Sequence, residues 1–273
     1  MKKNLIIAAI MLFATMTASA QYKDFYFGLK FGPHIDWAGS STKTVDNDKV
    51  KMGFNFGFVG EYYFVENYAL EFGLNLDFLR NRYEYDEARQ VNLNIDNPAL
   101  YSLVNPVDSI WGTVNRTMRG TYVEIPIMLK MRTNEFGDWR FFGEVGLAVG
   151  VRAKASAKDV FTYNIKGNPV LTPLSPLEDQ QYIDKSEKFA NVTSQYNLFT
   201  LKYIVAGGAE YSINGSTRAF ARIIFNGNIL NNLSASYAKG DTEKDKNKVY
   251  DYIRPEKLDV HPYSIGLELG IMF

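Results

Sequence analysis

The sequence predicts an all-β protein, an eight-stranded antiparallel up-and-down transmembrane β-barrel with short periplasmic turns and long extracellular loops. Three observations predict this fold. Apolar and polar residues alternate in eight segments, the connections between them are alternately long and short, and 15% of the residues are aromatic. A chain of 273 residues accommodates these strands without a second domain.

The first twenty residues, MKKNLIIAAIMLFATMTASA, have the features of a secretory signal peptide. Lys2 and Lys3 precede an apolar run that ends at the small residues Ala18, Ser19 and Ala20. This run is too short to remain as a transmembrane helix, and no later apolar segment has the length of one. We therefore expect residues 1–20 to be removed and residues 21–273 to form one barrel domain in the cell outer membrane.

The eight expected strands share one pattern, in which every second residue is apolar and frequently aromatic. In the third, YALEFGLNLDFLRNRYEY, the apolar row runs from Tyr68 to Phe78. The strands are expected at residues 25–37, 52–64, 68–85, 118–132, 139–155, 197–212, 218–237 and 260–273. In the same order, their polar rows contain Lys30; Glu61; Glu71 and Asp77; Glu124 and Lys130; Glu144 and Arg152; Lys202 and Glu210; Arg222; and Glu268.

The polar rows are rich in glycine and single charges, which is typical of a narrow lumen with interleaved side chains. A soluble β-sandwich also alternates, but its polar rows face water, where glycine is rare. An eight-stranded barrel is just wide enough for its interior side chains to fill it. Because an unpaired buried charge costs several kcal/mol, we expect the charges above to pair in a network that plugs the barrel.

The connections support the same topology. Joins near 65–67, 133–138 and 213–217 are short and contain the turn-forming sequences ENY, NEFGD and NGS. The long joins are at 38–51, 86–117, 156–196 and 238–259. Outer-membrane barrels have short turns on the periplasmic side, so the long joins are expected outside the cell.

Composition excludes several function classes. With 30 basic and 30 acidic side chains, the chain shows no basic surface for nucleic acid. It has no cysteine, which excludes disulfides and a lipid-carrying cysteine. Two histidines without cysteine predict no metal site, and no glycine-rich phosphate loop indicates a cofactor.

The segment YVEIPIMLK, Tyr122 to Lys130, resembles the Tyr-Leu-Glu-Ile-Pro-Leu-Leu-Leu-Lys signature of the PorT-like outer-membrane barrel family. Its motif residues are Tyr122, Glu124, Pro126 and Lys130, and FGLKFGPHI, FFGEVGLAVG and VAGGAEYSI are looser similarities. The resemblance spans essentially the mature chain, although the 156–196 segment is long for the family. It implies an outer-membrane barrel and, through the founding member, a part in protein secretion to the cell surface.

Two positions have a local interpretation. Proline lacks a donor for strand pairing, so Pro126 inside an apolar run predicts a β-bulge. The final segment LELGIMF is similar to the terminal strand that the outer-membrane assembly machinery recognises, which makes Phe273 an expected assembly signal. The alternative is that Phe273 is one more lipid-facing residue.

The leading functional hypothesis is a surface or secretion-linked scaffold or binding protein that acts through its long loops. Its expected partners are outer-membrane lipid, the assembly machinery and an envelope or secretion component, with LTPLSPLEDQQYIDKSEKF as the segment most suited to a protein partner. A narrow porin is the first alternative. An outer-membrane lipid- or peptide-modifying enzyme is the second: His34, Asp36 and His261 could meet near the outer rim, but no serine in a nucleophile-like setting accompanies them, so we expect no enzyme.

Overall fold

The computed structural model describes residues 25–40, 50–90, 109–164, 181–185, 188–234, 236–240 and 253–273. The expected signal peptide lies outside these ranges. The strands are β1 (Phe25–Gly39), β2 (Lys51–Val65), β3 (Tyr68–Gln90), β4 (Ser109–Arg132), β5 (Trp139–Asn164), β6 (Gln181–Lys185), β7 (Ala190–Asn191), β8 (Phe199–Asn214), β9 (Thr217–Asn228), β10 (Ser236–Gly240), β11 (Ile253–Lys257) and β12 (His261–Met272), with a short 3-10 turn η3 (Thr193–Gln195). Among the described residues, no helix is long and apolar enough to cross a membrane.

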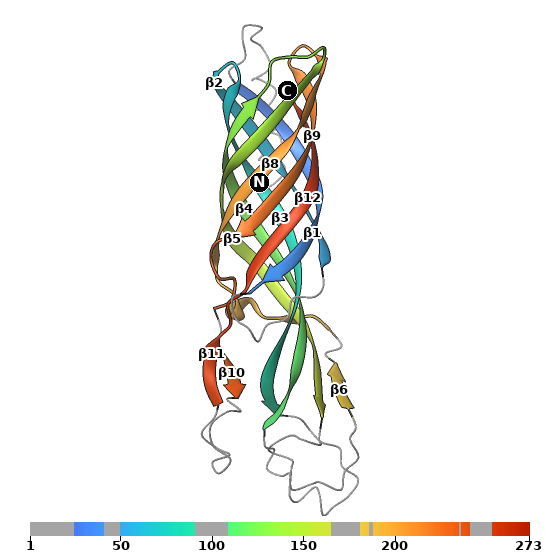
Figure 1. The fold of residues 1–273 in the computed structure, drawn as a ribbon, viewed down its shortest axis with the longest axis vertical. Coiled ribbons are helices and arrows are strands. Elements are labelled where there is room, and N and C mark those ends of the chain that lie inside the picture. Colours follow the sequence, from blue (N-terminus) through green and yellow to red (C-terminus); the bar gives the residue numbers. More distant parts are fainter. Residues whose placement is uncertain are drawn as a thin grey trace, which may run out of the picture.

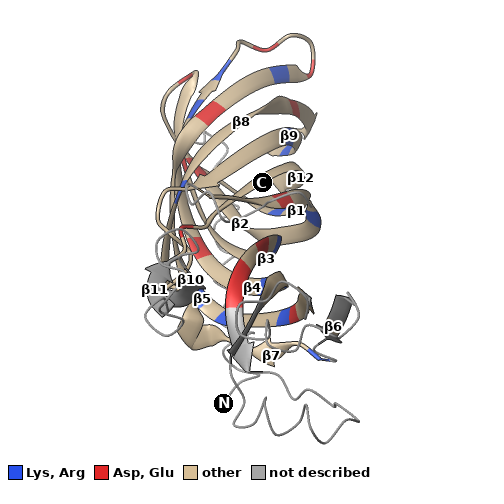
Figure 2. Cartoon of the chain, turned by 60° about the horizontal axis from the view of Figure 1, so that its bottom comes forward, with Lys and Arg blue, Asp and Glu red and all other residues tan. Residues whose placement is uncertain are grey.

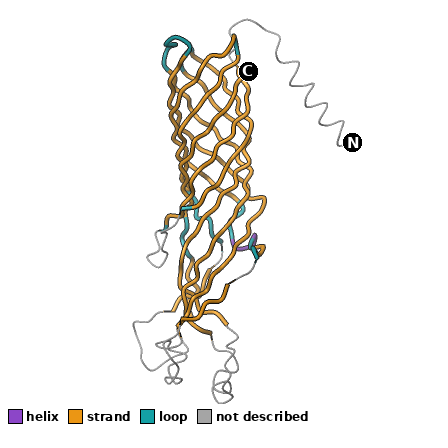
Figure 3. The backbone as a smooth tube through the Cα atoms, turned by 90° about the vertical axis from the view of Figure 1, so that its right-hand side faces the viewer, coloured by secondary structure: helices purple, strands orange, loops and turns teal. Residues whose placement is uncertain are grey.

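Eight of these strands close into an antiparallel barrel, which confirms the predicted fold class (Figure 1). Neighbours follow the order β4, β3, β2, β1, β12, β9, β8 and β5, and β5 pairs with β4 to complete the ring. Paired residues followed around the barrel from Phe27 lead back to β1 at Trp37, which gives a shear of ten (37 − 27 = 10). Such a shear corresponds to strands tilted by about 40°, and Figure 3 shows that the strands run obliquely to the long axis of the barrel.

The two ends of the barrel differ. At one, which we call the turn end, β2–β3, β4–β5 and β8–β9 are joined through residues 66–67, 133–138 and 215–216. Gly137 and Gly215 have positive φ angles of 65° and 52° there, a conformation that favours glycine. We call the opposite end the loop end. It carries the two-stranded β10–β11 sheet and β6, which pairs with β5 (Figure 1).

Side chains alternate across the barrel wall as the sequence predicts. On β1, Phe31 is 52% exposed, whereas its neighbour Lys30 is 4% exposed. The same alternation of exposed and buried residues continues along β2. The molecule is therefore inverted relative to a soluble protein, because the apolar row faces outward and the charged row faces inward.

This polarity reverses in the loop-end parts of β3, β4 and β5. There the inward row becomes apolar, with Tyr83, Val114 and Phe161 almost fully buried. The outward row becomes polar, with Arg80 and Arg119 exposed. The reversal indicates that these strands leave hydrocarbon and enter water at this level.

The reversal also explains why three strand ends differ from prediction. The sequence pattern predicts ends at residues 85, 118 and 155, but β3 continues to Gln90, β4 begins at Ser109 and β5 continues to Asn164. The prediction looked for strands whose outward row is apolar along their whole length. It therefore does not recognise the loop-end parts, where the outward row is polar and the inward row is apolar. The expected 86–117 and 156–196 loops are accordingly partly strand.

Two further expectations were wrong. The seventh strand ends at Asn228 instead of residue 237, because residues 229–234 turn over the barrel mouth and bury Asn232 and Leu233. No bulge occurs at Pro126: the β3–β4 register is the same on both sides of it, with Phe72 opposite Ile127 and Asn75 opposite Glu124. The β4–β5 pairing shifts instead between Thr121 and Tyr122.

Candidate functional site

The lumen is the candidate site, because charged side chains from every barrel strand meet in it. The twelve expected lumen charges are Lys30, Glu61, Glu71, Asp77, Glu124, Lys130, Glu144, Arg152, Lys202, Glu210, Arg222 and Glu268. Eleven are buried, and Arg152 is half-buried near the loop end. Figure 2 shows acidic and basic residues distributed along the strands around the barrel.

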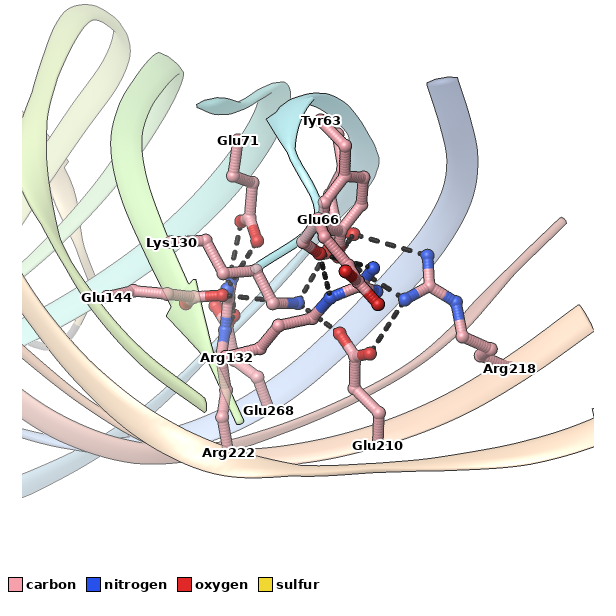
Figure 4. Close-up of polar contacts among 11 residues, drawn as sticks. Tyr63, Glu66, Glu71, Lys130, Arg132, Glu144, Glu210, Arg218, Arg222 and Glu268 are labelled. Carbon is pink, nitrogen blue, oxygen red and sulfur yellow. Dashed lines mark hydrogen bonds and ion pairs between the residues drawn. The ribbon is translucent and has the colours of Figure 1, made fainter. Parts of the chain in front are cut away.

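A first cluster lies toward the turn end and centres on Lys130 (Figure 4). The Lys130 ammonium forms ion pairs with Glu61 and Glu210 and lies 4.0 Å from the Phe142 ring centroid. Arg218 also forms an ion pair with Glu210, at 2.7 Å. The Tyr63 hydroxyl donates to Glu61 at 2.7 Å. Two cations and two carboxylates thus pair with one another across this level of the lumen.

Arg222 is the centre of a second cluster (Figure 4). Its guanidinium donates to both oxygens of Glu71 at 2.9 Å and also bonds Glu144. Its Nε donates to Glu268 at 2.8 Å, and Lys30 lies 3.4 Å from the same carboxylate. A planar guanidinium has donors on several edges, so this single arginine can bond three carboxylates at once.

A third cluster lies toward the loop end. The Lys202 ammonium is 2.6 Å from both Asp77 and Glu124. His34 contacts two carboxylates, Asp36 through Nδ1 at 2.6 Å and Asp77 through Nε2 at 3.0 Å. Asp36 also accepts the backbone N–H of Arg80 at 2.8 Å. Charged side chains from β1, β3, β4 and β8 therefore contact one another across the lumen at this level too.

A cap covers the third cluster at the loop end. The Tyr122 hydroxyl donates to the Asn232 side chain at 3.0 Å, and the Asn232 backbone bonds Asn197 and Val260. Arg152 donates to the carbonyl oxygens of Tyr196 and Asn197. Leu233, which is fully buried, packs in the apolar cluster that also holds Tyr122 and Tyr196. Segments 192–198, 229–234 and 258–260, which we call the mouth cap, therefore lie across the barrel opening.

The four motif residues lie on one face of β4, where all are buried toward the lumen. Lys130 belongs to the first cluster, Glu124 to the third, and Tyr122 to the mouth cap. Pro126 lies between them. It faces Gly73 of β3 so closely that a Cβ atom added at Gly73 would lie 3.6 Å from the Pro126 Cγ atom. The motif thus places one residue at each of several levels of the lumen.

Sequence reasoning missed Arg218 and Asn232. Arg218 is 2% exposed and has the same parity as Arg222, but it is the first residue of the strand expected there, where the face is hard to assign. Asn232 was expected inside a strand. The signal for it was the asparagine-rich segment NILNN, in which the alternation of β9 is lost.

The histidines do not form a joint site. His34 pairs with Gly266 and His261 with Gly39, so five register positions separate them (39 − 34 = 5). His261 is on the outward row, where its Nε2 contacts Asp259 at 2.8 Å. Both ring nitrogens of His34 are engaged by carboxylates, which leaves neither to activate a nucleophile.

One acidic group in the described part of the chain has its carboxylate oxygens close enough to hold a metal ion. It consists of Glu61, Glu71 and Glu144, with ligand atoms within 4.8 Å of one another. Lys130 and Arg222 form ion pairs with these carboxylates. These three carboxylates are therefore already paired with the protein's own cations.

Phe273 lies at the turn end, next to the start of β1. Its backbone N–H donates to the Phe27 carbonyl at 2.7 Å and its carbonyl accepts from the Phe27 N–H at 3.3 Å. Its side chain is 48% exposed on the lipid-facing side. This geometry extends the β1–β12 seam, and recognition of Phe273 by assembly machinery stays a prediction.

Comparison with known proteins agrees with this architecture. A family model described as "Outer membrane protein beta-barrel domain" matches residues 17–237. No curated protein matches the chain. Among solved structures, the attachment invasion locus protein Ail of Yersinia pestis is 11% identical with a TM-score of 0.35, covering 92% of this chain and 99% of that one.

Two other solved structures are similar at the same level. Neisserial surface protein A is 10% identical with a TM-score of 0.35, covering 90% of this chain and 95% of that one. OprG from Pseudomonas aeruginosa is 9% identical with a TM-score of 0.33, covering 93% and 98%. At these identities the likeness concerns the fold alone.

Proposed function

The chain belongs to the outer membrane protein β-barrel domain family, and from this premise we propose that it is a closed membrane anchor for a binding surface. The barrel spans the outer membrane with its loop end outside the cell. Its lumen passes no solute. The parts of β3, β4 and β5 beyond the reversal of polarity, together with the connecting loops, bind a protein of the envelope or of a secretion system.

The observation that carries this proposal is ion pairing across the lumen at successive levels. Lys130, Arg222 and Lys202 each bridge carboxylates from different strands, and the mouth cap covers the loop end. An eight-stranded barrel has little interior space beyond its side chains. These contacts support an anchor better than a channel.

The extension of β3, β4 and β5 supports the binding role. Its inward face is held by Tyr83, Met118 and Phe161, which are almost fully buried, so it is a supported sheet and not a free ribbon. A rigid sheet presents side chains in a fixed arrangement, which lowers the ordering cost of binding. The resemblance to the PorT-like family favours a secretion component as partner.

Closure is tested by single-channel recording of the mature chain in planar bilayers. We expect no steady currents from the natural sequence. The double variant Arg222→Ala/Glu71→Ala removes a charge-balanced pair from the lumen and should raise conductance, whereas Arg140→Ala/Glu135→Ala removes an exposed pair and should not. Steady large currents from the unmodified barrel would contradict the anchor.

Partner binding is tested by photo-crosslinking in intact cells. A crosslinking residue at Thr113 or Thr162, on the outward face of the extension, should capture a discrete protein. The same residue at Leu267, which faces lipid, should not. Equal capture at all three sites would contradict the binding role. So would the absence of any captured protein at Thr113 and Thr162 when the barrel is inserted in the membrane.

A narrow porin is the second candidate, and one observation favours it. Buried side-chain oxygens of Asn55, Asn75 and Thr200 have no hydrogen-bond partner among the described residues. Water molecules normally satisfy such groups. Water inside the lumen near the third cluster would therefore bond these oxygens. Swelling of proteoliposomes in small sugars would support the porin; an unchanged volume supports the anchor.

A further inference from the structure

A group of basic residues lies on the outer wall of the barrel, where the loop-end parts of β3, β4 and β5 begin. Arg80 of β3, Arg119 of β4 and Lys154 of β5 are exposed, and Arg82 and Lys158 are half-exposed on the same outward rows. Strand pairing brings them together: Arg80 is directly opposite Arg119, and Arg119 is opposite Ser156, the residue midway between Lys154 and Lys158. We call these five residues the basic wall.

The basic wall is confined to one side of the barrel. The outward rows of β1, β2, β8, β9 and β12 carry no lysine or arginine. At the loop end, four of these strands instead present stacked or tilted aromatic rings. Trp37 lies 6.0 Å from Tyr263, and Phe225 lies 6.4 Å from Tyr263 and 5.9 Å from Tyr203 between ring centroids. Aromatic rings of this kind mark the interface of a membrane.

The position of the basic wall relative to the apolar belt indicates its environment. On the same strands and the same face, the residues nearer the turn end are apolar: Leu76 and Phe78 on β3, Val123 on β4 and Val149 and Val151 on β5. The basic residues are thus the first charged side chains beyond hydrocarbon. Lipid headgroups lie at this level.

Three charges of the basic wall, those of Arg80, Arg119 and Lys154, are not balanced by a neighbouring carboxylate in the described part of the chain. Among the described residues, no carboxylate lies within ion-pair distance of Arg80, Arg119 or Lys154. The acidic residues further along bond elsewhere, because Glu84 accepts from Asn115 and Asp159 pairs with Arg116. Like charges directly opposite on paired strands destabilise a sheet.

One basic side chain is held in place. The Arg119 guanidinium lies 3.7 Å from the centroid of the Phe189 ring, a cation–π contact that orients its plane. Opposed arginines on neighbouring strands lie about 5 Å apart at their Cα atoms, a spacing at which one anion can bond both.

From these observations we infer that the basic wall binds the phosphate group of a membrane lipid in the leaflet at the loop end. The acyl chains lie against the apolar rows below, and the phosphate lies between Arg80 and Arg119, with Lys154 beside it. The site rests on the proposed membrane location of the barrel and adds a lipid class to it. Bound phosphate also removes the repulsion between the opposed arginines.

The test uses the mature chain refolded in neutral maltoside micelles, with phosphatidic acid as the probe and phosphatidylcholine of the same acyl chains as the comparison. Native mass spectrometry counts the retained lipid. The natural chain should retain phosphatidic acid in preference to phosphatidylcholine. Arg80→Gln/Arg119→Gln should bind it at least tenfold more weakly, whereas Arg80→Lys/Arg119→Lys should bind it within threefold of the natural chain.

A matched control removes two cations elsewhere, in Lys51→Gln/Arg140→Gln, and should leave binding unchanged. Millimolar inorganic phosphate should not displace the lipid; displacement would reassign the site to free phosphate and overturn the lipid inference. Equal loss in the control, or unchanged binding in the glutamine pair, would also overturn it.

Heat-dependent gel mobility reports whether the barrel is folded, so it distinguishes failure of the lipid site from failure of the membrane anchor. A folded barrel shows the mobility shift whether or not it binds phosphatidic acid, so a folded barrel without lipid preference refutes this inference and leaves the membrane anchor standing. A chain that does not fold in micelles contradicts the anchor itself. In lipid-free neutral micelles, the glutamine pair should resist urea at least as well as the natural chain, because it lacks the opposed charges.

Discussion

Replacing Arg222 by methionine tests whether the lumen network stabilises the folded barrel. Methionine preserves most of the side-chain volume and removes the charge. In the structure, Glu268 keeps Lys30 at 3.4 Å and Glu144 keeps Lys130 at 3.6 Å, but Glu71 loses the guanidinium that contacts both its oxygens. Removing one partner of a buried ion pair costs about 3–5 kcal/mol, so we expect a loss of about 4 kcal/mol in the free energy of unfolding.

The assay is urea unfolding from phosphocholine vesicles, followed by tryptophan fluorescence and heat-dependent gel mobility. The double variant Arg222→Met/Glu71→Gln removes the unpaired carboxylate and should recover at least about 1 kcal/mol, a coupling typical of contacting residues. Arg140→Met is the matched control, because its pair with Glu135 is partly exposed and should be worth less than about 1 kcal/mol. A loss below about 1 kcal/mol for Arg222→Met, or simple additivity in the double variant, would refute the reasoning.

Three further outcomes follow from single contacts. Tyr122→Phe removes the 3.0 Å bond to Asn232, so we expect a loss of about 1–2 kcal/mol and faster amide exchange in residues 229–234, measured by mass spectrometry. Deleting Phe273 should reduce insertion in cells while refolding in micelles continues; equal loss in both settings would mean a structural role and no assembly signal. Gly28→Val should abolish the folded gel band, because a Cβ atom there would lie 2.1 Å from the Ile271 carbonyl oxygen.

The lipid-spanning part of the fold could be predicted from sequence because hydrocarbon imposes one rule on every strand. Exposed side chains there must be apolar, so a row such as Phe54, Phe56 and Phe58 identifies both the strand and its outer face. Once the outer face is known, the inner face follows by alternation. The lumen position of Glu61 is therefore implied by the exposure of Tyr62 beside it.

Three-dimensional pairing could not be predicted in the same way. Alternation states that Lys130 and Glu210 point inward, but their contact depends on the tilt that brings β4 and β8 together across the lumen. The mouth cap was missed for a different reason. Asn232 and Leu233 are buried by segments far away in sequence, and local periodicity contains no trace of such contacts.

The charged lumen also specifies strand register, which an apolar filling would leave open. A slip of β4 by one residue would turn Glu124 and Lys130 toward lipid, and a basic side chain in mid-bilayer costs about 2–4 kcal/mol. A slip by two keeps the faces but moves Lys130 from its place opposite Glu144 to a place opposite Phe142 or Gly146. Clusters at several levels of the lumen therefore destabilise both kinds of register slip. Within β4, the motif from Tyr122 to Lys130 supplies the residues that join these clusters. The ion pairs across the lumen thus select one register among those that the alternation of apolar residues permits.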